Sequence, residues 1–152
     1  MKLIELSIPT GTSEKLKKRV HKLQQAMDEL NKKELPDAMV QEFNQRIETL
    51  NQMQVDEKKL RKKIGRVQHD IVTQVAKKLK IVPKNYYRNL WLAIGMSAFG
   101  IPMGVSFGAS LDNMAFIGIG LPIGMAIGIA IGAGMDKKAK EEGRQLNLEI
   151  EL

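Results

Sequence analysis

The residues of this chain that could take part in chemistry are few, and their spacing assembles no reactive group. The two histidines are His21 and His69, and cysteine is absent, which excludes disulfides, thiolate metal sites and thiol nucleophiles. His69 is followed directly by Asp70, but neighbouring residues of a helix do not face each other. The sequence also has no metal-ligand set, phosphate-binding loop or nucleophile motif. We therefore expect a protein that is not an enzyme and uses no metal or cofactor.

The charges divide the chain into three segments. Residues 1–88 carry 20 Lys or Arg and 11 Asp or Glu, whereas residues 89–135 carry only Asp112. Residues 136–152 carry four basic and five acidic groups. These boundaries predict a cytoplasmic helical region, a transmembrane hairpin and a cytoplasmic tail, in that order. Asp112 lies between the two apolar runs rather than inside one, so a relay of protons or ions through buried carboxylates is not expected.

Two apolar runs in the central segment have the length of transmembrane helices. Residues 90–109 and 114–135 contain 20 and 22 residues without a charge, and the short polar turn 110–113 separates them. At about 1.5 Å per residue, each run spans the roughly 30 Å hydrocarbon core of a bilayer. The pattern predicts a two-pass helical hairpin. The alternative, a buried hairpin of a soluble protein, needs a larger polar shell than this chain has.

The residues that flank the two runs predict the orientation of the hairpin. Basic residues precede the first run and follow the second, whereas the turn has no Lys or Arg. The positive-inside bias therefore places both termini in the cytoplasm, and tyrosine and tryptophan favour the headgroup level. The basic and aromatic residues expected at the lipid interface are Lys84, Tyr86, Tyr87, Arg88, Trp91, Lys137 and Lys138.

Small residues recur every four positions inside both runs and predict close packing of the helices. The runs share an internal repeat at an offset of 20 residues, in which glycines and prolines keep their register. Glycines spaced by four line one helix face and let two backbones approach, and the pattern resembles the glycine zippers of oligomeric channels and membrane-active peptides. The glycines expected to pack the helices are Gly100, Gly104, Gly108, Gly120, Gly124, Gly128 and Gly132.

A second stripe of small residues is offset from these glycines by two positions. Its members are Ala98, Pro102, Ser106 and Ser110 in the first run, and Gly118, Pro122, Ala126, Ala130 and Gly134 in the second. Two residues turn a helix by about 200°, which places this second stripe on the opposite face. A single hairpin uses one face of each helix, so we expect the other face to contact another subunit and predict a homo-oligomer.

Each run contains one proline, and the two prolines are expected at similar depth in the bilayer. Pro102 and Pro122 each remove a backbone donor and can kink their helix, which provides either a hinge or a bend that improves packing. Small and large residues also alternate with period two, which fits a β-hairpin of a multi-subunit barrel. The central prolines and the Gly and Ala face argue against that alternative.

The flanking segments predict further helices and two short strands. Apolar residues at heptad spacing indicate helices over about 13–33, 36–52 and 56–82, packed as a coiled-coil bundle. Alternating apolar residues at the two ends of the chain predict strands over 2–8 and 145–152. The predicted fold class is therefore mainly α, with a cytoplasmic helical bundle, a two-pass hairpin of glycine-zipper type and short terminal strands.

A dense basic run lies in the third predicted helix. Its members are Lys58, Lys59, Arg61, Lys62, Lys63 and Arg66. A solvated helix face is the simplest interpretation, and anionic lipid or an acidic cytoplasmic protein are the candidate partners. Nucleic acid is the least favoured ligand because no aromatic residue is interleaved for base stacking.

These features lead to two hypotheses of similar weight about function. In the first, the chain forms a homo-oligomeric pore or channel-like assembly in the membrane, controlled by its cytoplasmic helices, and an apolar pore lined by Gly and Ala would gate by dewetting. In the second, the hairpin anchors a non-conducting scaffold or adaptor, or an accessory subunit of a membrane complex. The solute, the stoichiometry and the partner cannot be deduced from the residues.

Overall fold

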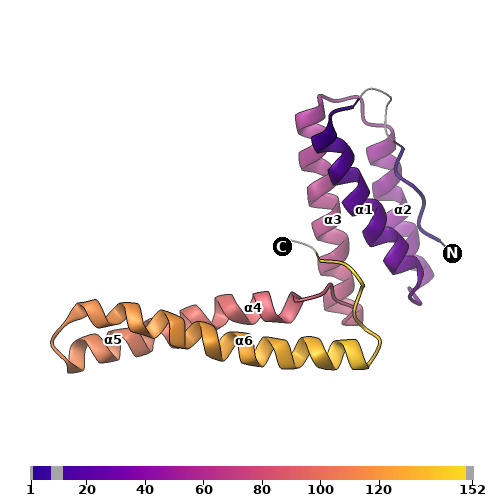
Figure 1. The fold of residues 1–152 in the computed structure, drawn as a ribbon. Coiled ribbons are helices and arrows are strands. Elements are labelled where there is room, and N and C mark those ends of the chain that lie inside the picture. The colour runs from indigo at the N-terminus through magenta and orange to yellow at the C-terminus, as the bar shows by residue number, and fades with distance from the viewer. Residues whose placement is uncertain (1, 8–11, 150–152) are drawn as a thin grey trace. The chain divides into compact units, whose positions relative to one another are not determined.

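The computed structural model describes residues 2–7 and 12–149, which form helices joined by short connections (Figure 1). The elements are α1 Glu14–Asn31, α2 Asp37–Asn51, α3 Glu57–Leu79, α4 Tyr86–Gly95, a π-helical turn Met96–Gly100, α5 Ile101–Ser110, a 3-10 turn Met114–Phe116 and α6 Ile117–Glu141. The chain divides into two compact units, residues 1–81 with 146–152 and residues 82–145. The prediction of a mainly helical chain is confirmed.

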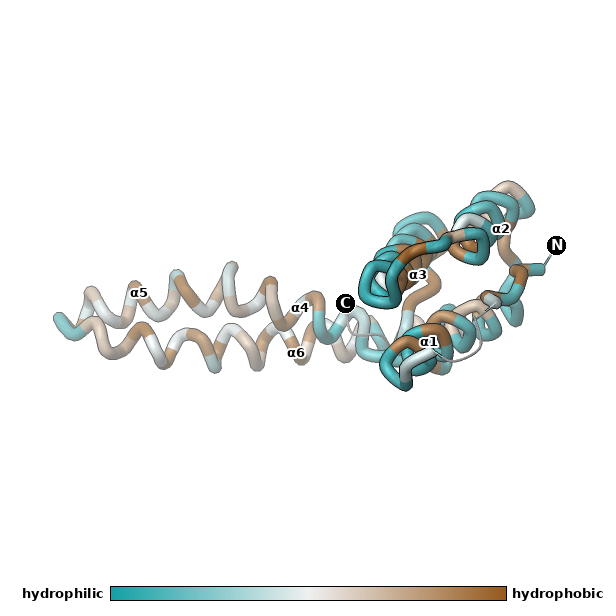
Figure 2. Tube along the Cα trace, turned by 90° about the horizontal axis from the view of Figure 1, so that it is seen from above, coloured by the Kyte–Doolittle hydropathy of each residue, from teal (hydrophilic) through white to brown (hydrophobic). Residues whose placement is uncertain are grey.

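The first unit, called the bundle below, is built on large apolar side chains. Helix α3 packs against both α1 and α2. Leu23 and Leu30 of α1, Phe43 and Ile47 of α2, and Ile71 of α3 are all 1 % exposed or less. Each of these helices turns its brown apolar side toward its neighbours and its teal side outward (Figure 2). Burial of one apolar face per helix therefore stabilises this unit.

The ends of the bundle helices follow from local chemistry. The Ser13 hydroxyl accepts a hydrogen bond from the Leu16 amide at 3.4 Å, and the Asp56 carboxylate accepts one from the Lys58 amide at 3.2 Å. Such side chains satisfy amide groups that the first helical turn leaves free. Helix α3 ends because Lys80 adopts a left-handed φ of 58°. The three helices begin and end within three residues of the bounds expected from sequence.

An extended segment, residues 2–7, lies against α2 and is held there by side-chain amides. Asn44 accepts a hydrogen bond from the Ile4 amide and donates one to the Lys2 carbonyl, both at 3.0 Å. Asn51, one heptad further along α2, makes the same pair of bonds to the segment at 2.8 and 3.2 Å. Each asparagine thus takes the place that a neighbouring strand would occupy.

Helix α1 holds the same segment from the other side. The Asn31 side chain accepts a hydrogen bond from the Leu3 amide at 2.9 Å, and the Gln24 side chain accepts one from the Leu6 amide at 3.4 Å. Leu3 is buried and Leu6 packs against the core, whereas Ile4 is 37 % exposed. The spacing of three differs from the alternation of two that predicts a strand.

The predicted strands over 2–8 and 145–152 are not supported, because no strand forms among the described residues of either end. At the start, side-chain amides satisfy the backbone in place of a partner strand. At the end, Gln145 makes only an isolated parallel bridge to Val82, and Leu146 enters the core of the bundle. Residues 8 and 150–152 of these predictions lie outside the described part of the chain.

The second unit, called the hairpin below, consists of α4, the π-helical turn and α5 packed antiparallel to α6 (Figure 1). The continuous helical stretches Tyr86–Ser110 and Met114–Glu141 are 25 and 28 residues long, and both are long and apolar enough to cross a membrane. Only 17 % of the most apolar window of each stretch is buried. The tube of the hairpin is white to brown along most of its length, with teal at the turn (Figure 2).

Candidate functional site

The hairpin is the candidate functional site, and its helices meet along the predicted glycines. All seven are buried. A β-carbon added at Gly100 would lie 3.1 Å from the Gly120 carbonyl oxygen, and one added at Gly128 would overlap the backbone of Trp91. Six of the seven meet the backbone of the opposite helix in this way, while Gly108 meets the side chain of Met114 at 3.1 Å. The glycines therefore allow direct backbone contact between the two helices.

Gly95 belongs to the same contact, although spacing by four does not find it. Its β-carbon would overlap the Gly124 carbonyl, and Gly95 is buried while Met96 is only half-buried. The reason is the π-helical turn Met96–Gly100, where the Ile101 amide bonds to the Met96 carbonyl five residues back. One extra residue per turn brings Gly95 and Gly100, five positions apart, onto the same face. The spacing of five between Gly95 and the first glycine of the stripe, Gly100, is the sequence signal that could have revealed this contact.

The two prolines lie at different kinds of position. Pro102 lies inside the continuous helical stretch Tyr86–Ser110, directly after the π-helical turn, and its missing amide donor coincides with that change of helix type. Pro122 lies inside α6, which continues unbroken on both sides. Both prolines are exposed on the second stripe. A change from π-helix to α-helix therefore occurs next to Pro102, whereas none occurs at Pro122. The predicted hinge role of both prolines stays a prediction.

Asp136 joins the two helices of the hairpin at the end opposite the turn. Its carboxylate accepts hydrogen bonds from the backbone amides of Tyr87 at 3.0 Å and Arg88 at 2.9 Å, and Asp136 is 7 % exposed. Asn85, at the cap position of α4, adopts a left-handed φ of 59° and makes no side-chain cap bond. Asp136 thus caps α4 from the other helix, where the helix dipole favours a negative charge.

Asp136 also continues the glycine series by one step of four from Gly132. The charge pattern alone assigns Asp136 to the tail and predicts no role for it. An acidic residue in register with a small-residue stripe, at the end of an apolar run, is the signal that could have identified it. The hairpin is therefore held by glycines along its length and by a carboxylate at its open end.

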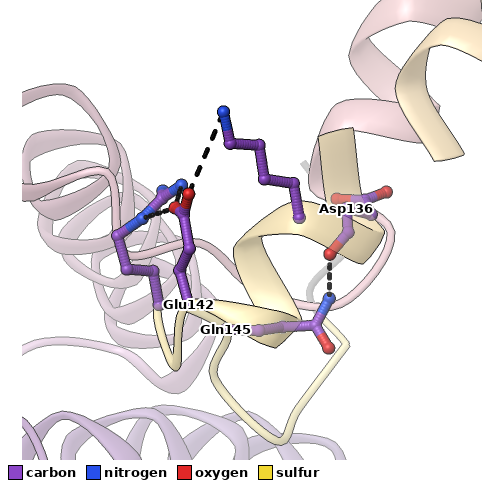
Figure 3. A network of polar contacts seen from close by, with 5 residues as sticks. Asp136, Glu142 and Gln145 are labelled. Atoms are coloured by element: carbon purple, nitrogen blue, oxygen red, sulfur yellow. Dashed lines mark hydrogen bonds and ion pairs between the residues drawn. The ribbon is translucent and has the colours of Figure 1, made fainter. Parts of the chain in front are cut away.

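A polar network follows Asp136 along the chain (Figure 3). The Gln145 amide donates to the Asp136 carbonyl oxygen at 3.5 Å, and Lys138 lies 3.9 Å from Glu142. Glu142 also pairs with Arg144, and the hydrogen bond between them raises the pKa of the Arg144 guanidinium above its ordinary value. These contacts fix the turn that ends α6.

The residues expected at the lipid interface gather at this end of the hairpin. The rings of Tyr86 and Tyr87 meet edge to face with centroids 5.2 Å apart, and Trp91 is half-buried one turn further on. Lys84, Arg88, Lys137 and Lys138 are exposed around them. Aromatic and basic side chains therefore surround the open end, while Asp112 is the charged residue at the turn.

The second stripe of small residues lies on the exposed surface of the hairpin. All its members are exposed, and a β-carbon added at Gly118 or Gly134 would meet nothing within 4 Å. The two stripes therefore differ in environment, although both consist of small residues spaced by four.

No known protein family, characterised protein or solved structure matches the chain. The architecture defines its class, a helical bundle joined in one chain to an apolar helical hairpin with a glycine-lined interior.

Proposed function

We propose that this chain is an integral membrane anchor whose hairpin crosses the bilayer twice and self-associates through the second stripe, holding the bundle in the cytoplasm. The observation that carries this proposal is the exposed apolar surface of the hairpin. The large exposed apolar residues of α4, the π-helical turn, α5 and α6 are Leu90, Ile94, Phe99, Ile101, Val105, Phe107, Ile119, Ile129, Ile131 and Met135.

Exposed apolar area supports insertion into lipid. Burial of apolar surface is favourable by roughly 25 cal/mol per Å², and a bilayer offers that burial without any further protein contact. The core helix of a soluble protein is mostly buried, whereas only 17 % of each apolar window is buried here. Helices also satisfy their own backbone groups, as a lipid environment requires.

The flanking charges support an orientation with both ends in the cytoplasm. The open end of the hairpin carries Lys84, Arg88, Lys137 and Lys138, and the turn carries Asp112 without a basic residue. Positively charged flanks are retained on the cytoplasmic side. The same charges are attracted to the anionic lipids of that leaflet.

Self-association through the second stripe is supported because the glycine face is already buried between the two helices of the hairpin. Gly95, Gly124 and their neighbours contact the partner helix of the same chain, so they are not available to a second subunit. The second stripe is exposed and has room beside Gly118 and Gly134. Small residues on a lipid-exposed face allow close helix association between subunits.

A non-conducting anchor is favoured over a pore by the hydroxyl groups of the hairpin. The Ser97 hydroxyl donates to the Ala93 carbonyl at 3.0 Å, and the Ser106 hydroxyl donates to the Pro102 carbonyl at 2.9 Å. Their protons are thus used within their own helix. A pore remains the second candidate, because Ser106 and Ser110 lie on the exposed second stripe and their oxygens could still accept hydrogen bonds from water.

The test compares two variants of equal size change. Ala126→Leu enlarges the second stripe by three carbons, whereas Ile131→Phe adds three carbons at an exposed position about 140° further around α6, away from that stripe. We expect mass measurement in nanodiscs to show a defined oligomer that Ala126→Leu dissociates and Ile131→Phe preserves. Ion flux into liposomes then separates the two candidates, since flux through the oligomer would favour the pore. A monomeric wild-type protein would contradict both.

A further inference from the structure

The bundle carries a groove of about 580 Å³ beside α1 and α3, which we call the arginine groove. Its lining comprises Arg19 of α1 and, from α3, Arg61, Lys62, Gly65, Arg66 and His69. Asp70 is the one acidic residue of the lining. The basic run of α3 is visible in the sequence, whereas the contribution of Arg19 from α1 is not.

Gly65 shapes this groove by leaving room for Arg19. A β-carbon added at Gly65 would lie 3.1 Å from both Cζ and Nε of Arg19 and would overlap the end of the guanidinium. The guanidinium therefore lies directly over the α3 backbone. A glycine inside a helix costs about 1 kcal/mol relative to alanine. The gap that this glycine leaves is occupied by one charged group.

The arginines of the groove have no carboxylate partner among the described residues. Ion pairs within 4.0 Å in that part of the chain include those of Lys17, Lys32, Arg46, Lys137, Lys138 and Arg144, and none includes Arg19, Arg61 or Arg66. Of the acids nearest the groove, Asp70 lies 4.0 Å from Arg46, and Glu57 accepts a bond from the Ser13 amide at 2.8 Å while its charge also attracts Arg61. The groove lining therefore carries more basic than acidic groups.

We propose that the arginine groove binds a ligand bearing several phosphate groups, either free in solution or as a lipid headgroup. The planar fork of an arginine matches two phosphate oxygens at once, and Arg19, Arg61 and Arg66 offer three such forks. The volume is that of a small-molecule site. The lining has no aromatic ring, so it offers no surface for stacking a nucleobase. This site is independent of the proposed membrane anchoring.

The test uses the full chain in phosphatidylcholine nanodiscs and titrates inorganic tripolyphosphate by calorimetry at physiological salt. We expect saturable binding that Arg19→Gln weakens about tenfold, the loss typical of one charge-assisted contact. Lys18→Gln removes the same charge from the adjacent position of α1, outside the groove lining, and should change the affinity by less than about twofold. Equal losses in both variants would overturn the site, because they would indicate diffuse attraction alone.

A charge-neutral variant gives the sharper result. Gly65→Ala keeps every charge and favours the helix, but its methyl group displaces the Arg19 guanidinium. We expect it to weaken tripolyphosphate binding about fivefold while the bundle unfolds at the same temperature or higher. Unchanged affinity in this variant would overturn the proposal.

Two further titrations separate the sources of the ligand. Nanodiscs that also contain phosphatidylinositol bisphosphate test the headgroup, with protection of α1 and α3 amides from hydrogen exchange as the signal. Protection that requires Arg19 and Gly65, without tripolyphosphate binding, would assign the site to headgroups. A polyglutamate peptide that binds with the same dependence would instead make the groove a carboxylate site and contradict the phosphate assignment. Absence of groove-dependent binding in every titration would also contradict it.

Discussion

The bundle and the hairpin solve the packing of helices in opposite ways. In the bundle, large side chains such as Phe43 and Leu23 fill the space between helices and are fully buried. In the hairpin, the contact is made where side chains are missing, and large residues such as Phe99 and Ile131 point outward. Water drives the first arrangement by expelling apolar surface, whereas in the proposed lipid environment the second would need backbone proximity, because lipid supplies no such drive.

The largest expected effect comes from a substitution in the core of the bundle, which should destabilise the bundle and leave the hairpin unchanged. Phe43→Ala removes a fully buried ring and should lower the free energy of unfolding of the bundle by about 3–5 kcal/mol. Val55→Ala, at a side chain that is 40 % exposed, is the control and should have little effect. Hydrogen exchange resolved by segment should show loss of protection in α1–α3 with α4–α6 unchanged. Parallel loss in the hairpin would show that the two units fold as one.

The converse change adds a methyl group to the hairpin. Gly128→Ala should destabilise the hairpin by about 3 kcal/mol, because its β-carbon overlaps the backbone of Trp91. Gly134→Ala is the matched control, since its β-carbon meets nothing within 4 Å. Thermal unfolding in detergent, followed by tryptophan fluorescence of Trp91, measures both. Equal behaviour of the two variants would refute the assignment of the glycine face to the interior of the hairpin.

Asp136 tests whether the hairpin also needs a polar contact. Asp136→Asn keeps the shape but leaves a single acceptor for the amides of Tyr87 and Arg88, so the open end should lose about 2 kcal/mol. Asp112→Asn in the exposed turn removes the same charge and serves as the control. Hydrogen exchange of the first turn of α4 should rise in Asp136→Asn alone. An unchanged rate would mean that the glycines hold this end unaided.

Asn44→Ala probes the extended segment that replaces a strand. The change removes two hydrogen bonds to residues 2–7 and should cost about 1 kcal/mol, with faster exchange of the Ile4 amide. Gln45→Ala, at the next and exposed position of α2, is the control. If both variants exchange alike, the segment is held by the burial of Leu3 rather than by the amide pair.

The smallest effect concerns pH at the C-terminal end of the bundle. The Glu29 carboxylate bonds to Lys32 and accepts a bond from the Asn147 amide at 2.7 Å, and these contacts hold its pKa below its ordinary value of 4.5. A lowered pKa in the folded state contributes stability above pH 4.5, which is lost as the pH falls through the folded pKa. The Asn147 amide proton shift should follow this titration by NMR, and Glu29→Gln should abolish it. A midpoint at or above 4.5 would contradict the contact.

Long periodic patterns predicted most of the fold. Heptad spacing located α1, α2 and α3 to within three residues, and the two uncharged runs located the membrane-length helices. Short patterns predicted less well, because alternation over a few residues does not say what satisfies the backbone. Residues 2–7 looked like a strand, but Asn44 and Asn51 supply the bonds that a partner strand would have made.

The candidate site was predicted in part. Spacing by four identified seven glycines, yet it missed Gly95, since a π-helical turn changes the spacing to five. It also could not tell which of two small-residue stripes faces inward, because both have the same period. The contribution of Arg19 to the arginine groove could likewise not be predicted from the sequence, since its place beside Gly65 depends on the packing of α1 against α3.

The sequence by itself determined the helical class, the apolar runs and the small residues that permit close approach, because these follow from local period and composition. Only the tertiary structure decided which small residues are buried between the helices of the hairpin, that Asp136 caps α4 from α6, and that Arg19 joins the basic groups of α3. The physical reason is that each of these depends on two segments distant in the chain meeting in one register. A periodic pattern reflects one helix alone and contains no information about which helix packs against it.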